Sequence, residues 1–254
     1  MKLTAAGLTD VGRKRKGNED FFHIDLERAL FIVADGMGGH VAGEVASKLA
    51  VQTIQEFMRV SDTDSEITWP FEFDKNLSEG GNRIQVAIQL ANREIVRHMA
   101  TREEHRGMGT TVVTAVVEDD ACYIGHVGDS RAYLVREGEI RQLTRDHTFV
   151  NEQVEKGFMS KAEAERHPAR NILTRAVGST EDLAVDISET PLQPGDFVLL
   201  CSDGLSSMVP DPEILGAILE KGADMEEGCK KLVSLANEHG GWDNVTVVLF
   251  HALA

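Results

Sequence analysis

The sequence has little cysteine and no long apolar run, and each shortage excludes a class of protein. Only three cysteines occur among 254 residues, and they lie within apolar stretches. Buried thiols in a reducing compartment are therefore expected, without a disulfide framework. No segment approaches the roughly 18 apolar residues of a membrane helix, and no apolar run of signal-peptide length precedes residues 13–16. We predict a cytoplasmic protein with no membrane partner.

Positive charge is also in deficit, because 26 Lys and Arg residues face 42 Asp and Glu residues, for a formal net charge of -16. This balance argues against nucleic acid as a partner of the whole molecule. An acidic surplus most often serves solubility, but it also fits a site that concentrates carboxylates to hold cations. The length and the 42% hydrophobic content allow one substantial core, in one domain or at most two.

Hydrophobic periodicity divides the chain into helices and strands. Helices are predicted at residues 44–59, 84–99, 149–156, 161–166, 211–222 and 225–236. Strands are predicted at residues 3–12, 21–34, 110–117, 121–127, 131–135, 197–202 and 245–250. Asn82 is the expected N-cap of the second helix, residues 61–81 are expected to be a surface excursion, and 131–135 should continue the preceding hairpin as a meander. Paired helices between runs of strands predict an α+β fold with layered sheets.

The strongest local pattern is an aspartate at the end of an apolar strand. A four-residue apolar run leads directly into Asp35, which begins a glycine-rich turn. The same pattern returns at Asp129 and Asp203, and Asp243 comes just before the last apolar run. A side chain at a strand end is held by a rigid element, so these four carboxylates are candidates for one shared site.

Several carboxylates placed together repel one another and are tolerated only around cations. Oxygen ligands without a histidine or thiolate cluster select Mg²⁺ or Mn²⁺ over Zn²⁺, and a glycine at Gly36 lets its carbonyl approach an ion. Two such ions ~3.5 to 4 Å apart are a known device for phosphoryl chemistry. Arg15 supplies the forked donor that phosphate oxygens prefer. The combination predicts hydrolysis of a phosphoester.

Each of these residues also has a purely structural explanation. Asp-Gly at a strand end is a common turn, so one such aspartate alone has about a one-in-five chance of being a ligand. Residues 13–16 alone are typical of a solvated basic patch, and His40 in a glycine loop is typical of a surface histidine. The prediction therefore depends on the repetition of the pattern.

Eight motifs follow one another in order over nearly the whole chain. They are Thr9–Gly12 with Arg15 and Asn18–Asp20, Val33–His40, Gly109–Thr111, Gly125–Arg131, Leu143–His147, Leu173–Gly178, Leu200–Gly204 and Trp242–Thr246. In this order they resemble the metal-dependent type-2C protein serine/threonine phosphatases (the PPM family), in their compact bacterial form.

The resemblance implies a four-layer α-β-β-α sandwich with two central antiparallel sheets. It implies a single catalytic domain over residues 1–254, with residues 146–171 as a flap beside the site. The implied activity is metal-dependent hydrolysis of phosphoserine and phosphothreonine in proteins by a water that two metals activate, without a covalent intermediate. Two Mn²⁺ or Mg²⁺ ions, with a possible third, are the implied cofactors. The implied partners are phosphoproteins and an opposing Hanks-type kinase, and the implied oligomeric state is a monomer.

The resemblance also implies roles for individual residues. Asp35 would bridge two metals, the Gly36 carbonyl would bind the first, and Asp203 and Asp243 would bind the second. Asp129 would hold a third metal together with Asp203.

Three further roles concern the substrate and the water around the metals. Glu19 and Asp20 would act mainly through metal-bound water, and Arg15 would hold the substrate phosphate. Many eukaryotic members place their proposed general acid, a histidine, directly after the Asp-Gly pair. Met37 stands there in this sequence, and His40 follows three residues later, as in bacterial relatives, so His40 is the expected proton donor.

Other mechanisms lack their required residues. None of the cysteines has the arginine of a Cys-x5-Arg phosphatase, and Cys201 stands where an aspartyl-phosphate enzyme needs aspartate. Gly128–Ser130 resembles a Gly-Asp-Ser hydrolase but lacks its Asp-x-x-His partner. No Gly-x4-Gly-Lys-Ser/Thr loop is present. The alternative on the same fold is a catalytically inactive phosphatase-like binding or regulatory module, which the loss of a metal aspartate would signal; none is lost.

Overall fold

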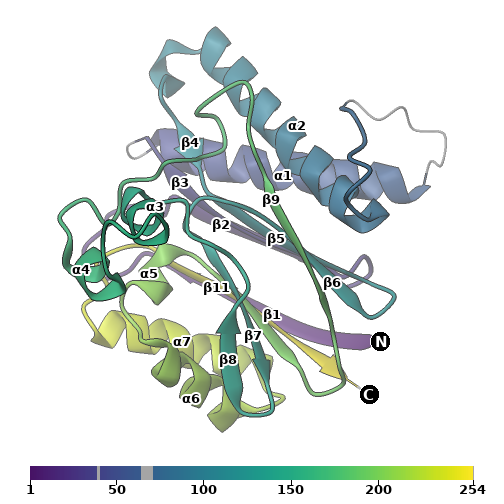
Figure 1. The fold of residues 1–254 in the computed structure, drawn as a ribbon, viewed down its shortest axis with the longest axis vertical. Coiled ribbons are helices and arrows are strands. Elements are labelled where there is room, and N and C mark those ends of the chain that lie inside the picture. Colours follow the sequence, from purple (N-terminus) through teal and green to yellow (C-terminus); the bar gives the residue numbers. More distant parts are fainter. Residues whose placement is uncertain (39–40, 64–70, 254) are drawn as a thin grey trace.

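Two antiparallel sheets packed face to face form the centre of the molecule, and helices cover both outer faces (Figure 1). The structure, a computed structural model, describes residues 1–38, 41–63 and 71–253. The predicted proton donor His40 and residues 64–70 of the predicted surface excursion lie outside the described residues. The layers confirm the predicted α+β sandwich with two antiparallel sheets.

One sheet has six strands, in the order β2-β3-β5-β6-β9 with β4 paired to β3. Its strands are β2 (Asp20–Asp25), β3 (Leu30–Met37), β4 (Gly109–Thr110), β5 (Val112–Glu118), β6 (Ala121–Val127) and β9 (Asp186–Pro191). The other sheet has five strands, in the order β1-β11-β10-β7-β8. Its strands are β1 (Lys2–Asp10), β7 (Arg131–Arg136), β8 (Glu139–Gln142), β10 (Phe197–Cys201) and β11 (Val245–Leu253).

Seven α-helices and one short 3₁₀ helix occur within the described residues. They are α1 (Val41–Thr63), α2 (Glu79–Thr101), η1 (Glu103–His105), α3 (Phe149–Glu155), α4 (Lys161–Arg166), α5 (Asp203–Ser206), α6 (Asp211–Lys221) and α7 (Met225–Glu238). Helices α1 and α2 cover the six-stranded sheet, and α6 and α7 cover the five-stranded sheet (Figure 1).

Alternation of side chains along the strands creates the layers. In β3, Ile32 belongs to the apolar cluster beneath α1 and α2, whereas Phe31 and Val33 belong to the cluster between the sheets. The rings of Phe31 and Phe250 stack across that interface with their centroids 4.1 Å apart. Because side chains in a strand alternate with a period of two, Asp35 continues the series that faces the other sheet.

The register of the strands brings the predicted aspartates to one end of the sandwich. Asp20 lies opposite Asp35 in the β2–β3 pair. In the other sheet β10 and β11 are antiparallel, with Cys201 opposite Val247. The end of β10, which leads into Asp203, therefore adjoins the start of β11, which follows Asp243.

Two strand predictions need correction, and strand β9 was missed. The range 21–34 holds two strands, β2 and β3, joined by a tight turn in which Ala29 has a φ of 47°. The strand at 131–135 does not continue a meander, because the chain passes from β6 in one sheet to β7 in the other. Strand β9 (Asp186–Pro191) was not predicted; it is an edge strand with mostly half-buried, polar residues, so it has no apolar alternation to reveal it.

The predicted cap of the second long helix is also wrong. Ser78 is the N-cap, and its hydroxyl accepts a hydrogen bond from Gly81 N at 3.3 Å. Asn82 lies inside α2, fully buried. Its amide donates to Asp74 O at 2.9 Å, while its carbonyl accepts from Asp74 N at 2.8 Å. Asn82 therefore ties the preceding loop to the helix, a tertiary role that a local capping rule does not detect.

Candidate metal and phosphate site

Five aspartates from both sheets lie close enough at one end of the sandwich to perturb one another electrostatically. Burial raises the pKa of Asp35 well above its usual value, and the nearby negative charges of the other four raise it further. Figure 1 shows this end beside α5, where β10 ends and β11 begins. The group consists of Asp20, Asp35, Asp129, Asp203 and Asp243.

Three members of the group titrate far above the ordinary aspartate range. Burial, opposed by hydrogen bonds from Thr246 and Ser202, raises the pKa of Asp20 to about 7. Burial raises the pKa of Asp129 to about 8, with the charge of Asp203 as the next cause. Burial and the charge of Asp243 raise the pKa of Asp203 to about 6. The hydrogen bonds and positive charges that the protein supplies therefore do not compensate for the cost of burying these negative charges.

The unsatisfied oxygens of this group are what a cation site requires. Asp20 Oδ1 and Asp203 Oδ1 are buried, and no hydrogen bond from the described residues reaches either atom. Asp20 Oδ2 accepts from the Ser202 hydroxyl at 2.8 Å, which fixes that carboxylate in place. Buried carboxylate oxygens without partners are costly unless a cation contacts them. The donor set, all oxygen, fits Mg²⁺ or Mn²⁺.

Two threonines hold the backbone of Asp35. Asp35 O accepts from the Thr110 hydroxyl and from Thr111 N, both at 2.8 Å. Asp35 N donates to the Thr111 hydroxyl at 3.1 Å. That hydroxyl also lies 2.6 Å from the Ser130 hydroxyl, so one side chain joins the end of β3 to the residue next to Asp129. The Gly109–Thr111 motif was recognised in the sequence, but this role was not.

Gly36 is required by crowding around its backbone. A Cβ atom at this position would lie 2.1 Å from Gly43 O, in the first turns of α1. Gly36 N donates to Glu19 O at 3.1 Å. The Glu19 carboxylate lies against Gly43, whose own Cβ would be 2.5 Å from Glu19 Oε2. Glu19 and Gly36, which were both predicted as site residues, therefore lie next to each other.

Arg15 and Asp243 form the ion pair at the edge of the group. Arg15 Nη2 donates to Asp243 Oδ2 at 2.8 Å, and this hydrogen bond is the main cause that raises the pKa of Arg15. The negative charges of Glu19 and Asp35 raise it too. The Arg15 side chain is half exposed, at 51%. Its remaining guanidinium donors can therefore reach a ligand from solvent.

Asn244 fixes the loop that carries Arg15. Its carbonyl oxygen accepts from Glu19 N at 2.8 Å. Its amide group donates to Val11 O and to Gly17 O, both at 2.9 Å. One side chain next to Asp243 therefore closes residues 11–19 against the start of β11, although sequence reasoning gave Asn244 no role.

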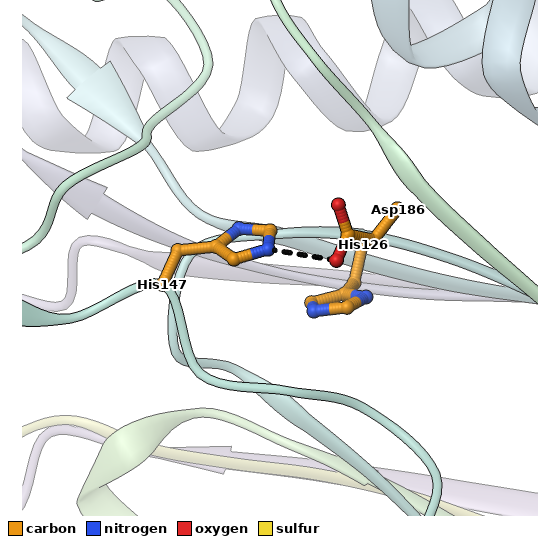
Figure 2. A group of neighbouring side chains, drawn as sticks. All are labelled: His126, His147 and Asp186. Atoms are coloured by element: carbon orange, nitrogen blue, oxygen red, sulfur yellow. Dashed lines mark ion pairs between the residues drawn. The ribbon is translucent and has the colours of Figure 1, made fainter. Parts of the chain in front are cut away.

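Two histidines and an aspartate form a second polar group, which Figure 2 shows. Within the described part of the chain it is the one set of three or more His, Cys, Asp or Glu residues whose ligand atoms all lie within 4.8 Å of one another: His126, His147 and Asp186. His147 Nδ1 accepts from Gly128 N at 3.1 Å, which leaves the ring proton on Nε2. That atom faces Asp186 Oδ2 at 3.2 Å.

The partners of Asp186 favour a network of polar contacts over a metal centre. The hydrogen bond from His147 holds the pKa of Asp186 below its usual range. Arg175 Nη1 also contacts Asp186 Oδ1 at 2.7 Å, so the carboxylate already has a cationic partner. His147 N donates to Gly128 O at 2.9 Å. His147 therefore forms hydrogen bonds with both the N–H and the carbonyl group of Gly128, the residue that precedes Asp129.

Each predicted site residue that the structure describes is linked to another of them by an electrostatic interaction or a hydrogen bond. Asp146, at the start of the predicted flap, acts on Asp129 by its charge, and it forms a two-point ion pair with Arg131 at 2.7 and 2.9 Å. The residues found together are Arg15, Glu19, Asp20, Asp35, Gly36, Asp129, Asp203 and Asp243.

Comparisons with known proteins give one consistent result. The profile of the family described as protein phosphatase 2C matches residues 12–238. The chain is 40% identical over 248 residues to "Serine/threonine phosphatase stp" of Listeria innocua, covering 95% of this chain and 92% of that protein. Its fold matches the crystal structure of the Mycobacterium tuberculosis serine/threonine phosphatase PstP/Ppp with a TM-score of 0.86, 33% identity and 99% of both chains covered.

One further structural relative was crystallised with metal ions. It is the catalytic domain of the serine threonine protein phosphatase PstP in complex with 2 manganese ions. The match has a TM-score of 0.83 and 32% identity, and it covers 99% of both chains.

Proposed function

The chain belongs to the protein phosphatase 2C family, and we propose which of its residues carry out the reaction. It is an enzyme, a metal-dependent serine/threonine phosphatase that acts on phosphoproteins. The aspartates expected to hold the metals are all present, so nothing favours the alternative of an inactive binding module.

Asp35, the Gly36 carbonyl, Asp203 and Asp243 are the proposed ligands of two divalent cations, Mn²⁺ or Mg²⁺. Asp129 and Asp203 would hold a possible third, and Glu19 and Asp20 would act through water around the metals. When bound, such ions neutralise phosphate charge and lower the pKa of a water molecule enough for it to attack phosphorus. The single observation that carries the assignment is the group of buried and half-buried aspartates that repel one another, two of whose buried oxygens have no hydrogen-bond partner among the described residues.

Arg15 is the proposed phosphate-binding residue. Asp243 holds one guanidinium nitrogen, so the planar fork is oriented before substrate arrives. The remaining donors can bind phosphate oxygens and keep the phosphorus in place over the carboxylate group. Because no nucleophilic side chain is assigned, the reaction would proceed without a covalent intermediate. His40, outside the described residues, is the proposed donor of a proton to the serine or threonine leaving oxygen.

The finer assignments of partners and organisation are proposals as well. We take residues 1–254 as one catalytic domain with residues 146–171 as its flap, working as a monomer. The opposing enzyme would be a Hanks-type kinase in the cytoplasm. Three buried, free cysteines are in keeping with a reducing compartment. No helix within the described residues has the length and apolar character to cross a membrane.

Replacing Asp35 with asparagine tests the ligand assignment. Turnover of a phosphoserine peptide in Mn²⁺ should fall by more than the ~10 to 100-fold typical for partners outside a metal's ligand shell. Near-unchanged circular dichroism would show that the fold survives. The matched control is Asp182→Asn, which changes an exposed aspartate and should leave turnover unchanged. Wild-type turnover in Asp35→Asn would refute the assignment.

A further inference from the structure

Residues 13–16 form a run of four cations in a molecule whose net charge is -16. All four are exposed. Of these cations, Arg15 alone forms an ion pair within residues 1–38, 41–63 and 71–253. Arg13, Lys14 and Lys16 thus lie beside the phosphate-binding residue without an ion-pair partner among the described residues. A local excess of positive charge in an acidic molecule attracts acidic ligands to that place.

This basic loop is fastened to the loop that carries Asp243. Arg13 N and Lys14 N both donate to Gly241 O, at 2.7 and 3.2 Å. The contact depends on glycine, since a Cβ on Gly241 would lie 2.7 Å from Arg13 Cγ and its φ is +53°. Lys14 and Trp242 are therefore held in a fixed position, each one residue away from a member of the Arg15–Asp243 ion pair.

Trp242 is the large aromatic side chain of this surface, and it is 62% exposed. Lys14 Nζ lies 5.2 Å from the centre of its ring, in range of a cation–π contact. A large exposed aromatic side chain beside several cations is the composition of a contact surface, because tryptophan, tyrosine and arginine contribute most to binding energies. We call Arg13, Lys14, Lys16 and Trp242 the docking platform.

We infer that the docking platform binds the segment next to the phosphorylated residue and selects phosphoproteins that carry acidic side chains there. The inference rests on the proposed role of Arg15, because the platform is adjacent to it. A peptide carboxylate can pair with the cations of the docking platform while the peptide backbone or an apolar side chain lies on Trp242. The rest of the chain carries an excess of acidic residues. Charge complementarity therefore favours an acidic peptide as the occupant.

The test compares kcat/KM for two phosphoserine peptides that differ only in Glu or Gln at the positions flanking the phosphoserine. One exposed ion pair contributes up to about fivefold, and the Glu peptide has more than one glutamate to pair with the platform. Wild type should therefore prefer the Glu peptide by about tenfold. Lys14→Glu should abolish or reverse this preference, and Trp242→Ala should weaken it. Lys75→Glu makes the same charge change at an exposed site in the loop before α2, and it should keep the wild-type preference.

The docking inference and the proposed function fail in different ways. Equal kcat/KM values for the two peptides in wild type, or a full preference in Lys14→Glu, would overturn the docking inference. Absence of Mn²⁺-dependent p-nitrophenyl phosphate hydrolysis would count against the proposed function instead. In that case fluorescence anisotropy with labelled Glu and Gln peptides repeats the comparison without turnover, and equal affinities would again overturn the docking inference.

Discussion

Asp20 is buried and Asp203 is half-buried, and each has one buried carboxylate oxygen without a hydrogen bond from the described residues. In water an aspartate ionises near pH ~4, yet these two titrate at about 7 and about 6. Without cations the fold therefore shifts both carboxyl groups toward their protonated forms relative to water. A site that is costly when empty is stabilised strongly by the ions that fill it.

The raised pKa values predict how the metal-free protein responds to pH. A carboxyl group whose folded pKa exceeds its unfolded value stabilises the fold fully below pH ~4 and loses that contribution as pH rises through the folded pKa. The relevant values are about 6, 7 and 8 for Asp203, Asp20 and Asp129. The melting temperature in EDTA should therefore fall between pH 5 and pH 8.5, by on the order of 5 to 10 °C.

Two comparisons isolate that effect. Mn²⁺ at pH 8.5 should restore most of the lost melting temperature, because the ions neutralise the ionised carboxylates. Asp203→Asn should flatten the fall, since it removes one of the interacting charges. A melting temperature in EDTA that is constant or rises across this range in wild type would be incompatible with the account.

Replacing Arg15 with lysine tests phosphate binding at a single residue. Lysine keeps the charge but loses the planar fork that Asp243 orients, so kcat/KM for a phosphoserine peptide should fall by about 10 to 100-fold, mostly through KM. Steady-state kinetics measure this split. The control Arg97→Lys changes an arginine that pairs with Glu94 on the surface of α2, and it should behave as wild type. An unchanged KM in Arg15→Lys would remove Arg15 from the phosphate site.

At the scale of elements, the turn between β6 and β7 carries Asp129 and switches the chain between sheets. Gly128 makes this turn possible with a φ of +108°, and a Cβ there would lie 2.6 Å from the Thr111 side chain. His147 holds Gly128 through its ring and its backbone. A residue in the segment after β8 therefore positions a carboxylate that follows β6.

Removing the His147 ring should loosen this turn. His147→Ala leaves the buried Gly128 N–H without its acceptor, which costs about 1 to 3 kcal/mol of folding stability. It should also weaken Mn²⁺ binding at Asp129 more than at the other carboxylates. Urea unfolding and calorimetric Mn²⁺ titration measure the two effects. His239→Ala, at an exposed ion pair with Glu213, is the control. Wild-type stability and Mn²⁺ binding in His147→Ala would contradict the positioning role.

Strands and helices with strong apolar periodicity were predictable from the sequence. Helix α1 appears where the pattern at 44–59 placed it, although its ends extend to Val41 and Thr63. What failed depended on distant partners. Strand β9 owes its existence to pairing with β6, and Asn82 serves a loop rather than a helix end. Neither partner can be read from neighbouring residues.

At the scale of the whole molecule, the strand-end aspartates could be picked out singly, but not their convergence. Asp35 and Asp243 are far apart in the sequence, and only the register of two different sheets brings them to one end. The resemblance to a family supplied the sandwich and the roles. The contact between Thr111 and Ser130 and the hydrogen bonds between His147 and Gly128 became visible only in the structure, because they join segments whose spacing follows no local rule.

The most direct test of the central claim is the position of Mn²⁺ in a crystal, measured by anomalous scattering. The account predicts two strong peaks within coordination distance of Asp35, Asp203 and Asp243, with a possible weaker third beside Asp129. It would be contradicted by carboxylate oxygens with no ion among them, or by Mn²⁺ bound only at His126, His147 and Asp186.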